Sequence, residues 1–256
     1  MNKLIASSGE CSRRKADDLI AAGRVSINGR IVTALGTKVD PEHDQVMVGD
    51  RQICPAASRE SNLPTYLALN KPVRTITSTS DPQGRTTVLD LLPEQMQGQR
   101  LLPVGRLDFM SEGLLLLTNN GELLHRLTHA GWHVPKTYRV CLRGRLDSKI
   151  LETFRTGMTL REGDVLAPVQ IEGVEAQSRK TWLELTLLQG RNRQIRRMCR
   201  DMGLTILRLM RTRQGPIELG DLPSGGFRSL DRQEVQSLLE ATGLSDSSGT
   251  RHGMQS

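Results

Sequence analysis

Short apolar runs, alternating or continuous, divide the chain into predicted strands. The segment VSINGRIV at 25–32 alternates apolar and polar residues around Asn28 and Gly29, a pair typical of a two-residue type I′ hairpin turn. The leucine run at 114–117 is interpreted as a plain core strand. Other predicted strands lie at 46–48, 65–70, 136–143, 169–174, 181–188 and 205–210.

Helical patterns fall between these strands, and several of their ends carry capping residues. Ser12 can cap a helix over 13–22 that Gly23 ends. Asp147 and Asp231 can each cap the helix that follows, another helix follows Gly121, and a basic helix over 191–202 ends at Gly203. Strands interleaved with few helices predict an α+β fold with a mixed sheet.

The 256 residues suggest about two domains. Residues 1–53 form one small predicted helix-plus-sheet unit, 54–64 a polar linker bracketed by prolines, 65–243 a larger domain, and 244–256 a disordered tail. No apolar stretch reaches the ~18–20 residues that span a bilayer, and the first residues lack a long apolar segment. We therefore expect a cytoplasmic protein without membrane contact.

The positive charge is concentrated in one segment. The formal net charge of the chain is +7. Residues 189–213 contain eight arginines and one acid, so the net charge of this segment alone equals that of the whole chain. Such a stripe is more typical of a nucleic-acid surface than of a solvated helix face. A second basic group, Arg13, Arg14 and Lys15, starts the first capped helix, where backbone N–H groups and cations can both face phosphate.

Metal and disulfide chemistry are not indicated. The four cysteines form no C-x-x-C pair and are expected to be free thiols. His125, His129 and His133 are spaced four apart, but Gly131 interrupts the helix that would align them. We expect neither a metal nor a cofactor.

Residues 9–29 resemble the RNA-binding domain named after the fourth protein of the small ribosomal subunit. The similarity rests on GECSRR at 9–14 and on IAAGRVSING at 20–29. This resemblance implies that the first unit binds RNA through its basic helix end.

The larger domain resembles pseudouridine synthases of the RsuA/RluB type. The most specific match is GRLDFMSEGLLLLTNNG at 105–121. LNKP at 69–72, SDPQGRTTVLDLLP at 80–93, HVPKTYRV at 133–140 and GRNRQIRRM at 190–198 match in order and spacing, and the similarity covers about residues 2–240. It implies a mixed, mainly antiparallel sheet and the isomerisation of a uridine in RNA to pseudouridine.

The resemblance assigns catalytic roles to Asp108, Tyr138 and Arg196. The reaction needs an ionised carboxylate, here Asp108, for which attack on the sugar, attack on the base and elimination all stay open. Burial would raise the pKa of a carboxylate, so a cation, here Arg196, must offset it. Extruding the base costs free energy that stacking on Tyr138 can offset. The RNA-binding residues expected in this domain are Arg106, Asn70, Lys71, Arg191, Arg193 and Arg197.

Two further positions, Arg74 and Glu112, lie in or beside the matched motifs. Glu112 falls at a variable position of the motif and is expected to face solvent. Arg74 stands at or near the place where the family has a glycine, so the loop after Asn70-Lys71-Pro72 is expected to differ locally and could add an RNA contact.

The segment at 80–93 is similar to segments of the large-subunit branch of this family, and this resemblance implies a uridine in large-subunit ribosomal RNA as the target. We expect that uridine to lie in a stem-loop and the enzyme to be a monomer. A small-subunit target stays open. So does an inert RNA-binding or ribosome-assembly factor, although such a factor would not need Asp108, Tyr138 and Arg196 together. An N-glycosidase that releases the base is the third alternative.

Overall fold

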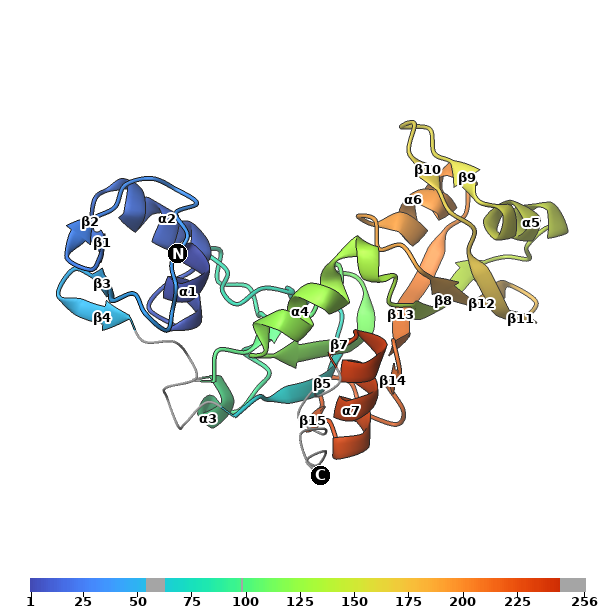
Figure 1. Ribbon diagram of the computed structural model, residues 1–256. Coiled ribbons are helices and arrows are strands. Elements are labelled where there is room, and N and C mark those ends of the chain that lie inside the picture. The colour runs from blue at the N-terminus through green and yellow to red at the C-terminus, as the bar shows by residue number, and fades with distance from the viewer. Residues whose placement is uncertain (54–62, 98, 245–256) are drawn as a thin grey trace, which may run out of the picture. The chain divides into compact units, whose positions relative to one another are not determined.

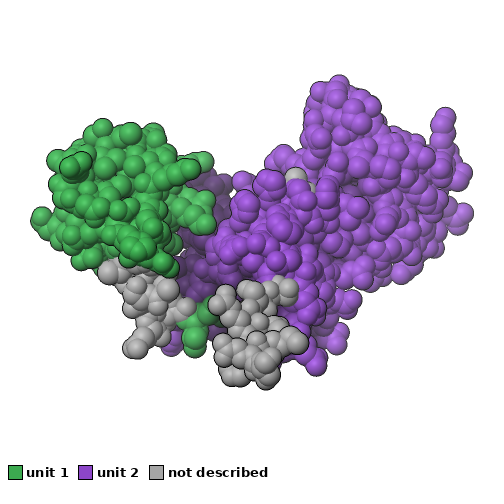
Figure 2. Space-filling view, in the orientation of Figure 1, with its two compact units in different colours: residues 1–64 green, residues 65–256 purple. Residues whose placement is uncertain are grey.

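The computed structural model describes residues 1–53, 63–97 and 99–244. The chain divides into two compact units, residues 1–64 and 65–256, which Figure 2 colours separately. Residues 54–62 and 245–256, which hold most of the predicted linker and tail, lie outside the described residues.

The first unit packs two helices against a small antiparallel sheet (Figure 1). Its core joins Ile5 and Ile20 from the helices to Val25 and Val46 from the sheet. The helices are α1 (Asn2–Ser7) and α2 (Arg13–Ala21), and the strands β1 (Val25–Ile27), β2 (Arg30–Ile31), β3 (Val46–Val48) and β4 (Arg51–Ile53) follow the order β2-β1-β3-β4.

Local signals predicted from sequence are confirmed in this unit. Asn28 and Gly29 have φ angles of 50° and 78°, so both central residues of the hairpin turn are left-handed, as a type I′ turn requires. The Ser12 side chain accepts a hydrogen bond from the amide of Lys15 and caps α2.

The second unit is built on a nine-stranded sheet that is mixed and mainly antiparallel, as predicted. Each named strand pair is antiparallel except β13 with β7, which is parallel. The main order is β11 (Gln170–Ala176), β12 (Lys180–Leu187), β8 (Lys136–Arg143), β13 (Ile206–Gln214), β7 (Glu112–Thr118), β5 (Tyr66–Lys71) and β15 (Phe227–Ser229), with β14 (Ile217–Glu218) on β13 and β6 (Leu102–Pro103) on β7. A separate pair joins β9 (Met158–Thr159) to β10 (Val165–Leu166).

Three of the described helices in this unit begin at a capping side chain. Asp147 caps the fifth helix and Asp231 forms a capping box with Glu234 at the seventh, as the sequence predicted for both aspartates. No described helix is long and apolar enough to cross a membrane. The helices are α3 (Glu94–Gln97), α4 (Gly121–Thr128), a 3₁₀ turn (Ala130–Trp132), α5 (Ser148–Thr156), α6 (Gln194–Asp201) and α7 (Arg232–Ala241).

Helix α6 starts later than the predicted 191–202. Arg193 is left-handed at a φ of 49° and stands just before the helix. The Gln194 side chain accepts a hydrogen bond from the amide of Arg191, which closes a turn ahead of the helix. Arg191 and Arg193 therefore lie on a loop.

Strand β7 is buried on both faces. Leu114 and Leu116 pack into one apolar cluster, while Leu115 and Leu117 pack into another. This double burial explains why the strand reads as a continuous apolar run rather than an alternating one. It also gives the loop that precedes β7 a rigid support.

A bulge in β13 controls which arginines face which side of the sheet. Arg211 pairs with Tyr138 and Arg213 with Thr137, so Thr212 is an extra residue in the ladder. Because successive side chains alternate between faces, a one-residue slip reverses the side that follows. Arg211 thus shares the face of Tyr138, and Arg213 lies on the opposite face.

Candidate active site

The sequence-predicted catalytic residues meet at one cavity of about 500 Å³. Asp108 comes from the loop before β7, Tyr138 from β8 and Arg196 from α6. Arg106, Arg191 and Arg193 also line this cavity. Asn70, Lys71 and Arg197 are not among the residues that line it, and Arg13, Arg14 and Lys15 belong to the other unit.

Two arginines hold the carboxylate of Asp108. Its Oδ2 atom lies 3.3 Å from Nε of Arg196 and 3.4 Å from Nη1 of Arg193. The Asp108 side chain is 29% exposed and that of Arg196 is 18% exposed, so this pair is partly shielded from water. Burial lowers the pKa of the Arg196 guanidinium, and the negative charge of Asp108 acts against that shift.

The turn that carries Asp108 is fixed by the same arginine. Nη2 of Arg196 donates to the Met110 carbonyl at 2.7 Å and to Oγ of Ser111 at 2.9 Å. The buried Ser111 in turn donates its amide to the Asp108 carbonyl at 2.9 Å. Arg196 therefore holds both the carboxylate and its backbone, and Ser111 is a supporting residue that sequence reasoning missed.

Lys71 supports this turn from inside the protein, which corrects its expected contact with RNA. Its side chain is fully buried, and Nζ donates to the carbonyls of Pro72, Asp108 and Ser111 at 2.9, 3.2 and 2.8 Å. Burial lowers the pKa of Lys71 to about 8. Asn70 is likewise turned inward and donates to the Leu222 carbonyl at 2.7 Å.

Arg74 adopts the backbone conformation of the glycine that the family resemblance expects there. Its φ is 62°, a left-handed value that costs free energy for any residue with a Cβ. Its amide donates to the Phe109 carbonyl at 2.6 Å and ties the loop after β5 to the residue that follows Asp108. The Arg74 side chain is exposed.

Gly113 permits the parallel pairing that places β7 beside β13. A Cβ at this position would lie 2.3 Å from the Arg211 carbonyl oxygen, and its φ is 98°. Any side chain here would force apart β7, which follows the loop of Asp108, and β13, which carries Arg211. The glycine of the matched motif thus has a structural cause.

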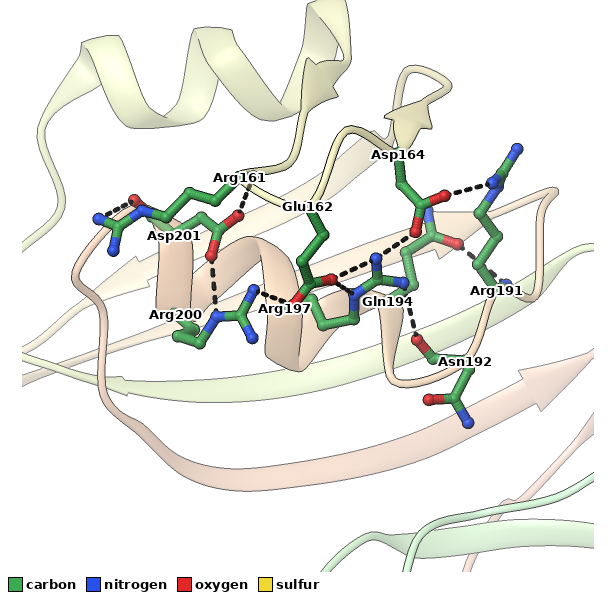
Figure 3. Close-up of polar contacts among 9 residues, drawn as sticks. All are labelled: Arg161, Glu162, Asp164, Arg191, Asn192, Gln194, Arg197, Arg200 and Asp201. Atoms are coloured by element: carbon green, nitrogen blue, oxygen red, sulfur yellow. Dashed lines mark hydrogen bonds and ion pairs between the residues drawn. The ribbon is translucent and has the colours of Figure 1, made fainter.

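Several arginines of the segment predicted to bind RNA form ion pairs with acidic side chains (Figure 3). Arg197 pairs with Glu162 and Asp164, and its side chain is only 16% exposed. Arg191 also pairs with Asp164, while Arg200 pairs with Glu162. The guanidinium of Arg197 therefore joins α6 to the β9–β10 hairpin, and its expected RNA contact stays a prediction.

The same holds farther along the arginine-rich segment. Arg208 pairs with Glu112, whose side chain is 13% exposed, so the expectation that Glu112 faces solvent is wrong. Arg213 pairs with Glu172. Much of the positive charge counted in sequence is thus matched by acids from distant parts of the chain.

Two further cations, which sequence reasoning did not single out, line the cavity. Lys136 and Arg211 lie on the face of the sheet that carries Tyr138. Lys136 stands two residues before Tyr138, so the period of a strand was a signal that could have found it. Arg211 could not be placed from sequence because its face depends on the bulge.

The comparisons with known proteins agree with this geometry. Residues 65–201 match the RNA pseudouridylate synthase family and residues 2–46 match the S4 domain. An uncharacterized RNA pseudouridine synthase of Aquifex aeolicus (strain VF5) is 39% identical over 245 residues, or 95% of each chain. A ribosomal large subunit pseudouridine synthase B of Bacillus subtilis (strain 168) is 36% identical over 239 residues, 93% of this chain and 94% of the relative.

A solved structure gives the same result. The crystal structure of a pseudouridylate synthase, 28% identical, aligns with a TM-score of 0.65 over 93% of this chain and 98% of its own. The chain therefore belongs to the RNA pseudouridylate synthase family and carries an N-terminal S4 domain.

Proposed function

We propose that this enzyme converts a specific uridine of large-subunit ribosomal RNA to pseudouridine. The observation that carries the proposal is the carboxylate of Asp108 held 3.3 Å from Arg196 in a cavity that Tyr138 also lines. Relatives from Bacillus subtilis and Haemophilus influenzae named ribosomal large subunit pseudouridine synthase B support the RNA class.

The site supplies what the isomerisation requires. The bond between C1′ of the ribose and N1 of uracil breaks, the base turns, C1′ bonds to C5, and the C5 proton leaves while N1 gains one. Asp108 acts on the base–ribose link, Arg196 orients its carboxylate, and Tyr138 stacks on the extruded base. The isomerisation has no net redox change, so it calls for no redox cofactor.

The S4 domain supplies phosphate contacts that position the RNA. Arg13, Arg14 and Lys15 are exposed in the first turn of α2, and no ion pair involves them within residues 1–53 as described. Cations at this positive end of a helix oppose its dipole, and a bound phosphate would remove that conflict. Arg106 and Arg193, both exposed, serve the mouth of the cavity.

The proposed substrate is a stem-loop, because unpaired loop bases are the least costly to extrude. We propose that the enzyme acts on it as a monomer in the cytoplasm.

The test is incubation of the purified protein with unmodified large-subunit ribosomal RNA, small-subunit ribosomal RNA and transfer RNA, followed by carbodiimide mapping of pseudouridine. We expect one modified position in the large-subunit RNA and none with Asp108→Asn. A product confined to another RNA would overturn the substrate, and free uracil would indicate a glycosidase instead. Absence of product from all three would contradict the proposed function.

A further inference from the structure

Lys136 and Arg211 form a pair of cations on the sheet face beneath the cavity. Arg211 of β13 is the register partner of Tyr138 of β8, and Lys136 lies two residues before Tyr138 on the same strand. All three residues line the cavity. Because directly opposed and alternate residues share a face, the two cations flank the aromatic ring proposed to stack on the base.

Neither cation has a carboxylate partner among the described residues. Arg211 is 1% exposed; its Nε donates to the Leu114 carbonyl at 2.7 Å, and its Nη2 is buried without any partner there. Nζ of Lys136 donates to the Val134 carbonyl at 2.9 Å. This differs from Arg193 and Arg196, which share the carboxylate of Asp108.

Such an arrangement is energetically costly without a partner for these groups. An unpaired N–H of a buried charged group loses its hydration without compensation. Burial, together with the nearby positive charge of Arg211, lowers the pKa of Lys136 to about 8, so the two cations also repel each other. A ligand with acceptor oxygens would relieve both penalties.

We propose that Lys136 and Arg211 form a subsite for the carbonyl oxygens of the extruded uracil and hold the negative charge that these oxygens gain during the reaction. The inference rests on the proposed function and adds a binding role for two residues outside the matched catalytic set. A base stacked on Tyr138 would lie over the sheet face that also carries Lys136 and Arg211. Phosphates remain at the mouth, where Arg106 and Arg193 are exposed.

The charge balance explains why cations are useful there. When the C1′–N1 bond breaks toward the base, its electron pair spreads from N1 onto O2 and O4. Addition of the carboxylate to the base would also place charge on O4. The charge disappears once C1′–C5 has formed, the C5 proton has left and N1 has been protonated. Preorganised cations in a shielded site therefore stabilise the charge-separated stage more than the bound uridine.

The experiment uses the RNA shown to be modified by the wild-type protein. Single-turnover rates and RNA affinity are measured for Lys136→Met, which keeps the length of the side chain, and for Arg211→Lys, which keeps the charge but removes the unpartnered Nη2 donor. A fall in the rate is expected for Arg211→Lys as well, because the proposed contact to the base is made by that donor. Lys180→Met, at the exposed start of β12, is the matched control. Thermal unfolding of each variant is recorded, and Arg211→Lys decides the result if Lys136→Met does not fold.

We expect Lys136→Met to reduce the rate by about 10²–10³-fold, the scale found when one donor to a developing oxyanion is removed, with RNA affinity changed less than threefold. Lys180→Met should match the wild type. A near-normal rate for Lys136→Met, or for Arg211→Lys if that variant decides, overturns the inference while leaving the proposed function intact.

Modified RNAs identify the atoms that the cations contact. The target uridine is replaced by 4-thiouridine or 2-thiouridine, whose sulfur accepts hydrogen bonds weakly, or a flanking phosphate is replaced by a neutral methylphosphonate. We expect at least one sulfur substitution to change the wild-type rate more than the rate of the variant, and the methylphosphonate to affect both equally. Loss of the methylphosphonate effect in the variant would show that the cations hold phosphate and would overturn the assignment to the base.

Discussion

Two basic regions of this protein use their charges in opposite ways. The first turn of α2 presents three exposed cations, and no acid pairs with them among the described residues of the S4 domain. The segment 189–213 holds more than twice as many arginines, yet most of them contact carboxylates. The smaller cluster is therefore the freer one. Charge counted along a sequence is not charge presented to a partner.

The difference has a structural cause. The acids that neutralise the arginine-rich segment come from other elements: Glu162 and Asp164 from the β9–β10 hairpin, Glu112 from β7 and Glu172 from β11. The segment thus ties α6 and β13 to their neighbours and orients Arg196 toward Asp108. The first turn of α2 is exposed, and within residues 1–53 no acid forms an ion pair with its cations.

The largest expected effect removes the acid at the centre of the paired region. Asp108→Asn keeps the shape of the side chain but cannot act as a nucleophile or base, so pseudouridine formation should fall by about 10⁴-fold or more. RNA affinity should stay the same or rise, because Arg193 and Arg196 lose their bound anion. Glu112→Gln, which breaks a pair with Arg208, is the control and should retain turnover.

Lys71 extends the comparison to a buried cation held by carbonyl oxygens alone. Its pKa of about 8 in the folded protein lies below the unfolded value, so between about pH 8 and 10.5 the unfolded chain binds more protons. Folding stability should therefore rise with pH in that window, by up to about 3 kcal/mol relative to Lys71→Met, and show no such difference in slope from pH 6 to 7. Urea unfolding at each pH measures it. Parallel curves throughout would contradict a lowered pKa.

The exposed cluster should matter for binding and not for folding. Replacing Arg13, Arg14 and Lys15 together with glutamine should reduce the salt slope of RNA binding by about 2, at roughly 0.7 per phosphate contact. The single-turnover rate at saturating RNA and the thermal midpoint should be unchanged. An unaltered salt slope would show that the S4 domain does not hold phosphate through this turn.

The smallest expected effect concerns a paired arginine of the other region. Arg197→Gln leaves Glu162 and Asp164 without their shared partner, so the midpoint of thermal unfolding should fall by about 2–5 °C, with no change in the salt slope of RNA binding. Arg14→Gln, an exposed position in α2, should show the reverse pattern. A reduced salt slope for Arg197→Gln would mean that RNA displaces the acids.

Local chemistry made part of this structure predictable. The Asn28-Gly29 turn, the Ser12 cap and the Asp231 cap each depend on residues within a few positions, and all three are present. The three catalytic residues assigned from the matched motifs, Asp108, Tyr138 and Arg196, also line one cavity. Interactions that close within a turn can be read along the chain.

Features that depend on distant partners could not be predicted in this way. Lys71 reads as an exposed cation beside a loop, and only the folded turn at 108–111 supplies the carbonyls that bury it. Arg197 meets acids more than thirty residues earlier, and the later start of α6 depends on the left-handed Arg193. The roles of these residues depend on their tertiary contacts and differ from the roles that their residue types suggest.

Because of the bulge at Thr212, the number of residues in β13 determines which arginine lines the cavity. Arg211 and Arg213 are the same residue type and stand two positions apart, on either side of Thr212, yet one lines the cavity and the other pairs with Glu172 on the opposite face. A regular strand would place both on one side. Insertion or deletion of a single residue here would change which arginine faces the cavity, although the arginines themselves would stay the same. Such sites can therefore diverge through insertions and deletions as well as through substitutions.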